Sequence, residues 1–119
     1  MKKEYRVKKS SDIEMIVKTK QSTGNKYFVV YKKENHDNTH FKVAISVSKK
    51  YGNAVKRNKI KRQVREIVFK MDIEPKFDVL VVIKVNAITL TFTEIKASIE
   101  QLVKKQNILR WIKWENQQE

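Results

Sequence analysis

The chain has 119 residues, of which 40% are hydrophobic and 34% are charged, so it fits one folded domain with a modest core. It contains no cysteine, which excludes a disulfide framework and a thiolate metal site. No apolar run approaches the ~18 residues of a membrane span, and the first residues lack the apolar core of a signal peptide. We therefore expect a cytoplasmic protein. Its formal net charge of +14 favours a polyanionic partner, most commonly nucleic acid, over an anionic membrane surface.

The amino-terminal segment is predicted to be a basic arm followed by a short helix. Residues 1–9 carry five Lys or Arg side chains and one acid, which indicates an extended arm. Ser11 and Glu14 fit a capping box, with Ser11 as the N-cap, and the helix is expected to end near Thr19. The apolar side of this helix consists of Ile13, Ile16 and Val17.

Two predicted strands joined by a polar hairpin loop follow. Residues 26–32 are aromatic and β-branched, which indicates a strand that is buried on both faces. The loop spans residues 33–40, and its two histidines have no third ligand in view, so we expect no zinc site there. Residues 41–48 alternate between apolar and polar types, which predicts a second strand. Its inward residues are Phe41, Val43, Ile45 and Val47, and its opposite face is small and smooth, with Ala44, Ser46 and Ser48.

A strongly basic helix is predicted directly after this strand. The stretch from Lys49 to Arg65 contains eight Lys or Arg residues and no acid. Gly52 and Asn53 interrupt the chain, and the residues from Ala54 onward favour a helix. One stripe of this helix is apolar and packs inward, while a neighbouring stripe of cations faces a partner. The apolar stripe is Ile60, Val64, Ile67 and Met71, and the cationic stripe is Arg57, Lys61 and Arg65, with Asn58 and Arg62 beside it.

We interpret the basic helix as a binding surface rather than a solvated face. Solvated helix faces usually mix charges of both signs at i, i+4 spacing, whereas this stretch has no acid before Glu66. Arginine can hold two phosphate oxygens at once with its planar fork, and lysine adds a less directional charge. The pattern therefore indicates recognition of a phosphate backbone.

The last part of the chain supplies one more strand and one more helix. Residues 77–83 follow a proline and indicate a strand buried on both faces. Thr91 and Glu94 form a second capping box, with Leu90 and Ile95 as its hydrophobic staple. The core stripe of this helix is predicted to be Phe92, Ile95, Ile99, Leu102 and Val103.

We expect a single domain over residues 1–119. The arm at 1–9 precedes it, and a tail of uncertain structure spans 107–119. Trp111 and Trp114 in this tail could extend the last helix, stack on RNA or cover the edge of the core.

The sequence shows no evident catalytic machinery. Its acids near the basic helix are scattered rather than clustered for metal ions, and no nucleophile–base pair or phosphate-cradling glycine loop is present. We therefore predict no catalytic residue, no metal ligand and no small-molecule substrate.

The run from Ser46 to Glu66 resembles the signature of the bacterial ribonuclease P protein subunit. This run reads Ser-Val-Ser-Lys-Lys-Tyr-Gly-Asn-Ala-Val-Lys-Arg-Asn-Lys-Ile-Lys-Arg-Gln-Val-Arg-Glu. The likeness extends from about residue 5 to residue 105. It implies an α+β single-domain sandwich of order αβββαβα, with a central sheet and the basic helix in an unusual left-handed crossover. The short strand that the residues alone do not place is expected at 21–23.

The resemblance also implies a function. Such a protein is the accessory subunit of the ribonuclease P endoribonuclease, which removes the 5′ leader of precursor tRNA to make the mature tRNA 5′ end. The RNA subunit performs the hydrolysis with bound Mg²⁺, and the protein, which needs no cofactor of its own, binds that catalytic RNA and the leader.

Carried over to this chain, the resemblance implies two sets of binding residues. In the family, the first helix carries aromatic residues that line the leader cleft, and the matching positions here, Ile13 and Val17, are aliphatic and cannot stack on bases in the same way. The expected leader-binding cleft consists of Ile13, Val17, Tyr31, Ser46 and Ser48. The expected contacts to the catalytic RNA are Lys49, Lys50, Asn53, Lys56, Arg57, Asn58, Lys59, Lys61, Arg62 and Arg65.

Two other interpretations stay open at the level of the sequence. A ribosomal or general RNA-structuring protein could also combine an α/β sandwich with a basic helix. A DNA-binding helix protein is favoured less, because Asn58 is the only good reader of base edges on the cationic arc.

Overall fold

The computed structural model describes residues 6, 7 and 10–110, which fold in the order αβββαβα. The helices are α1 (Ser10–Lys18), α2 (Ala54–Phe69) and α3 (Phe92–Gln106). The strands are β1 (Ser22–Gly24), β2 (Phe28–Glu34), β3 (Lys42–Val47) and β4 (Phe77–Ile83). Two 3-10 helices, η2 (Lys49–Tyr51) and η3 (Val85–Thr89), precede α2 and α3. The short strand expected at 21–23 is confirmed within one residue as β1. Trp111 and Trp114 lie outside the described residues, as does most of the arm.

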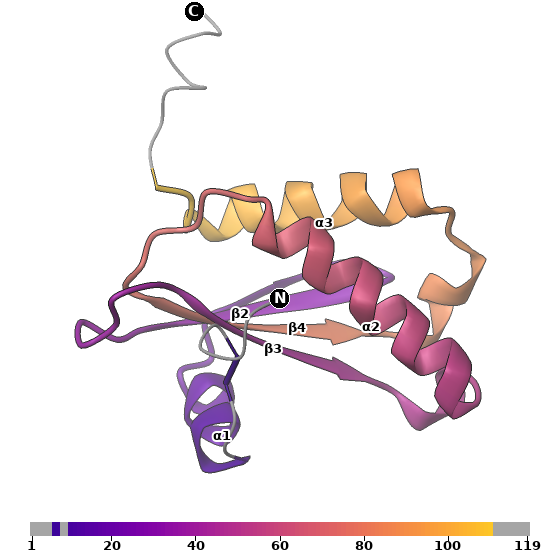
Figure 1. Ribbon diagram of the computed structural model, residues 1–119, viewed down its shortest axis with the longest axis horizontal. Helices are drawn as coiled ribbons and strands as arrows, with labels where there is room; N and C mark the ends of the chain where they lie inside the picture. The colour runs from indigo at the N-terminus through magenta and orange to yellow at the C-terminus, as the bar shows by residue number, and fades with distance from the viewer. Residues whose placement is uncertain (1–5, 8–9, 111–119) are drawn as a thin grey trace, which may run out of the picture.

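The four strands form one sheet in the order β1-β2-β4-β3. Strand β2 pairs antiparallel with both β1 and β4, whereas β3 pairs parallel with β4. Figure 1 shows α2 and α3 on one face of the sheet and α1 on the other. The predicted hairpin between β2 and β3 is wrong, because β4 lies between them. All residues of β4 except Val82 are buried, and such a strand is accommodated at the centre of a sheet rather than at its edge.

The connection from β3 to β4 is a parallel crossover that contains α2 (Figure 1). A parallel pair requires such a long connection, since a tight turn can only join antiparallel strands. The left-handed sense of this crossover stays a prediction from the family resemblance.

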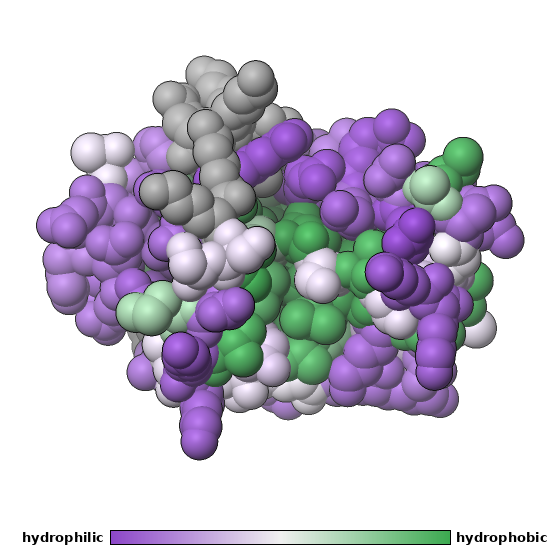
Figure 2. All heavy atoms as spheres, turned by 90° about the horizontal axis from the view of Figure 1, so that it is seen from below, coloured by the Kyte–Doolittle hydropathy of each residue, from purple (hydrophilic) through white to green (hydrophobic). Residues whose placement is uncertain are grey.

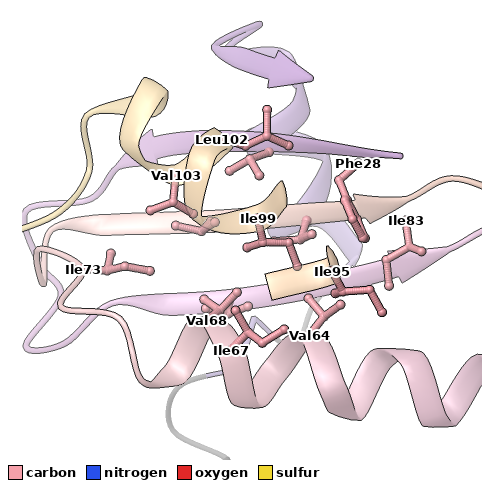
Figure 3. Packing of buried hydrophobic residues seen from close by; sticks show 14 of the residues in the cluster. Phe28, Val64, Ile67, Val68, Ile73, Ile83, Ile95, Ile99, Leu102 and Val103 are labelled. Carbon is pink, nitrogen blue, oxygen red and sulfur yellow. The ribbon is translucent and has the colours of Figure 1, made fainter. Parts of the chain in front are cut away.

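The main core lies between the sheet and the two helices α2 and α3 (Figure 3). The predicted apolar stripe of α2 is confirmed for Ile60, Val64 and Ile67, and Val68 joins it. The fourth predicted member, Met71, lies beyond the end of the helix and is half-buried against the same core. The stripe of α3 is confirmed for Ile95, Ile99, Leu102 and Val103. Each buried side chain of this size stabilises the fold by roughly 1.5–3 kcal/mol relative to its exposed state.

Phe92 was predicted in that stripe and is instead exposed, with 44% of its surface accessible. It is the first residue of α3, and the hydrophobic staple role falls to Leu90 and Ile95, which both belong to the main core. The aromatic ring therefore lies beside the core rather than in it.

A second, smaller core lies under α1. Ile16, Ala44 and Leu80 are buried there, and Val7, Ile13, Tyr31 and Val82 pack against them. The prediction that β2 is buried on both faces is therefore only partly right, since Phe28 and Val30 are buried while Val29 and Tyr31 are half-buried. The reason is the length of α1, because nine residues cover only part of this face of the sheet.

The starts of α2 and α3 follow local capping chemistry. Thr91 Oγ1 accepts from the Glu94 backbone N–H, and the Glu94 carboxylate accepts from the Thr91 N–H, so the predicted capping box is confirmed. Asn53 caps α2 through a hydrogen bond from the Lys56 N–H. The predicted N-cap at Ser11 is wrong, because α1 already includes Ser10.

Candidate nucleic-acid interface

Helix α2 presents its cations on two different arcs. Arg57, Lys61 and Arg65 are half-buried on the flank that packs beside β3, which is the edge strand of the sheet. The other polar residues of the predicted set on this helix are exposed; they are Lys56, Asn58, Lys59 and Arg62. The cationic stripe expected from the sequence therefore lies in the angle between the helix and the sheet edge.

None of the eight cations between Lys49 and Arg65 forms an ion pair within the described part of the chain. The ion pairs that are present involve Glu34, Glu74 and Asp72, which lie in other segments. Because no acid among the described residues neutralises the cationic stripe, its charge is available to an external anion.

Arg57 and Arg65, the two half-buried arginines of α2, have local surroundings that favour an anion. The Nε atom of Arg57 is buried and has no hydrogen-bond partner among the described residues. Burial lowers the pKa of the Arg65 guanidinium below its ordinary value, and the positive charge of Arg6 lowers it further. Both features disfavour the isolated charged surface, and a bound phosphate would relieve them by supplying an acceptor and a negative charge.

Arg6 is a candidate residue that the sequence analysis did not single out. The chain at this point pairs with β3, since Arg6 forms an isolated parallel bridge with Val43 and the Val7 N–H donates to the Val43 carbonyl at 3.1 Å. This pairing brings Arg6 near Arg65 on α2. The only sequence signal for it was the general basic character of the arm.

The segment before α2 positions further cations at the start of the helix. Lys49 and Lys50 are exposed in η2, and the Ser48 hydroxyl caps this turn by accepting from the Lys50 N–H at 3.2 Å. The Asn53 side chain likewise serves as the cap of α2. Ser48 and Asn53, both predicted to bind RNA, therefore have a structural role in which their side-chain oxygens accept backbone hydrogen bonds.

The face of the sheet that α1 partly covers, opposite α2 and α3, carries the residues predicted for the leader cleft. The strand register places Tyr31, Leu80 and Ala44 in one row, and Val29, Val82 and Ser46 in the next. Figure 2 shows this side of the molecule, with an apolar surface between hydrophilic borders. Helix α1 covers only part of this face, and Ser46 is exposed outside the covered part.

The structure brings the cleft residues together to different degrees. Ile13 and Tyr31 pack against the same small core under α1. Val17, also on α1, is 41% exposed, as is its neighbour Met15 at 52%. Ser48 lies beyond the end of β3, so the five predicted residues are on or next to one side of the sheet but do not form one contact cluster.

Within the described residues, no group of three His, Cys, Asp or Glu side chains could hold a metal ion. No helix in that same part of the chain is long and apolar enough to cross a lipid bilayer.

The fold and the unpaired cations define a basic α+β sandwich with a nucleic-acid-binding surface, and comparisons with known proteins identify the family. Residues 1–107 match the family model described as Ribonuclease P. The ribonuclease P protein component of Staphylococcus epidermidis is 45% identical over 106 residues, which cover 87% of this chain and 91% of that protein. That of Macrococcus caseolyticus is 43% identical over the same length and the same shares.

Solved structures give the same result. The RNase P protein of Staphylococcus aureus is 42% identical, with a TM-score of 0.82 over 89% of this chain and 98% of that one. The RNase P protein from Thermotoga maritima is 30% identical, with a TM-score of 0.75 over 84% and 96%. The chain belongs to the bacterial ribonuclease P protein family. It therefore has a role in the 5′ processing of tRNA, as the protein part of an endoribonuclease holoenzyme that contains ribonuclease P RNA.

Proposed function

We propose that the chain binds the catalytic RNA of ribonuclease P through α2 and its neighbouring cations, and the 5′ leader of precursor tRNA through the sheet face under α1. The observation that carries the first part is the half-buried stripe of Arg57, Lys61 and Arg65, which has no acidic partner among the described residues. A phosphate backbone supplies the missing counter-charges, and the released counterions drive association.

The second part of the proposal concerns the leader. A single strand is bound well by a groove that combines an aromatic ring with cations. Tyr31 supplies the ring on the sheet face. The hydrophilic residues around the apolar surface in Figure 2 supply polar contacts for the sugar-phosphate backbone of the leader. Leader recognition on the face opposite α2 allows the catalytic RNA and the precursor to be bound at the same time.

The third part concerns catalysis. In this proposal the RNA subunit, with bound Mg²⁺, performs hydrolysis of the phosphodiester in the cytoplasm, as the family resemblance implies. The protein acts as an accessory subunit that neutralises phosphates and holds the leader.

The first prediction tests the proposed α2 interface. Arg57→Ala, Lys61→Ala and Arg65→Ala should each weaken assembly with ribonuclease P RNA. Each lost phosphate contact should also reduce the slope of log affinity against log salt by about 0.7–0.9. Filter binding or fluorescence titration at several salt concentrations measures both quantities.

Lys105→Ala is the matched control, because Lys105 is an exposed cation in the last turn of α3, away from the stripe. Its affinity and salt slope should match those of the unaltered chain. If all three α2 variants assemble as the control does, this surface does not bind the catalytic RNA.

A further inference from the structure

A groove on the outer side of the molecule is not used by the proposed contacts of the cationic stripe or the cleft. It lies between α2, η2, η3 and the start of α3, and has a volume of about 330 Å³. Its floor is buried and apolar, formed by Tyr51, Ile60 and Ile95. The walls are Lys56, Lys59 and Gln63 on one side and Ile88, Leu90 and Phe92 on the other.

The groove lies on the opposite flank of α2 from the cationic stripe. At ~100° per residue, Lys56, Lys59 and Gln63 fall on the far side of the buried stripe from Arg57 and its neighbours. The basic helix therefore has two cationic borders, one beside β3 and one beside α3.

The wall formed by η3 and the start of α3 exposes two large apolar side chains to solvent. Ile88 is 47% exposed and Phe92 is 44% exposed. The position of Phe92 is fixed by the capping box around it, in which Thr91 and Glu94 exchange hydrogen bonds of 2.9 and 3.2 Å. The ring is thus held at the rim of the groove by a rigid helix start, and the Glu94 carboxylate beside it is engaged in the cap.

The opposite wall carries charge without a partner. Within the described residues Lys56 and Lys59 form no ion pair, and no acid lines this groove. The stem of Lys56 lies over Gly52, where an added Cβ would be 3.0 Å from the lysine Cδ. The glycine therefore allows Lys56 to lie back along the rim.

We propose that this groove binds one unpaired nucleotide of the RNA that α2 binds, with its base against Phe92 and its phosphate on Lys56 and Lys59. The proposal rests on the proposed function of α2. An aromatic ring facing two cations across an apolar floor matches the two halves of a nucleotide, a flat base and an anionic backbone. The Gln63 amide is placed on the wall where it can hydrogen-bond an edge of the base.

The charge of the groove decides between RNA and a protein partner. A neighbouring hollow of about 200 Å³ shares Phe92 but is lined by two lysines and two glutamates, Lys70, Lys96, Glu66 and Glu100. A lining of mixed charge does not favour a polyanion. In the groove beside it, the only charged lining residues are Lys56 and Lys59, and these belong to the basic surface of α2. The groove therefore complements a phosphate better than a protein segment of mixed charge.

The test compares substitutions at Phe92 for affinity to ribonuclease P RNA. Because Phe92 is exposed, Phe92→Ala should leave the melting temperature unchanged. It should weaken RNA binding about 5- to 150-fold, the range for loss of one stacked base, with an unchanged salt slope. Phe92→Trp should keep the affinity, whereas Phe92→Leu should lose most of it, because a base stacks on a ring and not on an aliphatic chain. Lys59→Ala should weaken binding and also reduce the salt slope by about 0.7–0.9.

Phe69→Ala is the matched control, since Phe69 is 39% exposed on α2 and lines neither hollow. It should bind RNA as the unaltered chain does. The inference is wrong if Phe92→Ala binds as tightly as this control, or if Phe92→Leu retains full affinity. It is also wrong if Phe92→Ala changes self-association in sedimentation while RNA affinity stays the same, since the groove would then bind protein.

Cross-linking separates this inference from the proposed function. The chain has no cysteine, so Ile88→Cys and Val55→Cys each provide a unique site for a photoactivatable aryl azide. Val55 is 76% exposed in the first turn of α2, outside the groove. We expect both to label ribonuclease P RNA, Ile88→Cys at an unpaired nucleotide. Labelling by Val55→Cys alone overturns the groove and leaves the α2 interface intact. Labelling by neither overturns both.

Discussion

Tyr31 lies in the middle of the sheet face under α1, in a row with Leu80 and Ala44 on the neighbouring strands. Its ring packs against the small core there and is only half-buried, so one part of it faces solvent. A tyrosine in this position can support the core and still offer a ring to a base. The two roles are separated by comparing ligands that do and do not carry a leader.

The second prediction follows from this position. Tyr31→Ala should weaken binding of precursor tRNA to the holoenzyme by roughly 1–3 kcal/mol, the range for one stacked base, and leave mature tRNA binding unchanged. An equal loss for both ligands would mean that Tyr31 acts through folding alone. Ile13→Phe should strengthen precursor binding, because it places a ring beside Tyr31 in the same cluster.

The third prediction concerns a buried amide. Gln106 is 5% exposed, and its Nε2 donates to the carbonyls of Gln21 at 2.9 Å and Val30 at 2.6 Å. It thereby ties the end of α3 to β2 and to the residue before β1. Gln106→Leu removes both hydrogen bonds, and the free energy of unfolding should fall by about 1–3 kcal/mol. Urea denaturation measures this, with the exposed Gln101→Leu as the control that should remain near the original value.

At the scale of elements, the start of α2 determines where most of the basic side chains point. Asn53 accepts a hydrogen bond from the Lys56 N–H at 2.9 Å, and this cap defines the first turn of a helix whose cations have no internal partners among the described residues. Asn53 was predicted to bind RNA. Its capping hydrogen bond means that a substitution of Asn53 could also weaken RNA binding by destabilising the start of α2. A helix that frays at this end would misplace Lys56 and Arg57 together.

The fourth prediction separates these explanations. Asn53→Ala should lower the free energy of unfolding by about 0.5–2 kcal/mol, whereas Asn53→Ser should retain most of it, because serine is an equally good N-cap. If Asn53 acts through the helix start, Asn53→Ser also keeps the affinity for ribonuclease P RNA. A serine variant that is as stable as the original chain but binds RNA as weakly as Asn53→Ala would instead indicate a direct contact of the amide.

At the scale of the whole molecule, folding concentrates positive charge. The eight cations from Lys49 to Arg65 are gathered on one helix and the turn before it, and the pairing of Arg6 with β3 adds another cation beside Arg65. Each repulsion is small in water, but their sum opposes the compact state. A modest core leaves little margin, since stabilities of about 5–15 kcal/mol are typical of such domains.

The fifth prediction is that multivalent anions stabilise the isolated chain. An anion that binds only the folded surface adds RT ln(1 + [L]/Kd), or about 2.7 kcal/mol at a hundredfold excess over Kd. Helix content and the melting temperature should therefore rise with millimolar sulfate more than with chloride at constant ionic strength. Circular dichroism in matched buffers measures this. A chain that is fully folded in low-salt chloride, with a melting point indifferent to sulfate, would contradict the prediction.

Local patterns in the sequence were sufficient to predict most elements, including the basic helix α2. The capping box at Thr91 and the apolar stripe of α2 depend on contacts between residues three or four apart, and the alternation in 41–48 depends on neighbours two apart. The basic stripe is visible for the same reason, because helical periodicity alone places Arg57, Lys61 and Arg65 on one arc. The family resemblance added the short fourth strand, which the local patterns did not place.

Only the tertiary structure decided which segments meet. Strand order depends on how each buried face is covered, so the placement of β4 between β2 and β3 is a property of the whole sheet. The exposure of Phe92 likewise depends on how the start of α3 packs beside α2, and the position of Arg6 depends on a pairing with Val43. Periodicity describes which side of an element is apolar, and it contains no information about which distant surface that side contacts. The groove between α2 and α3 and the arginines gathered beside β3 arise from such long-range contacts.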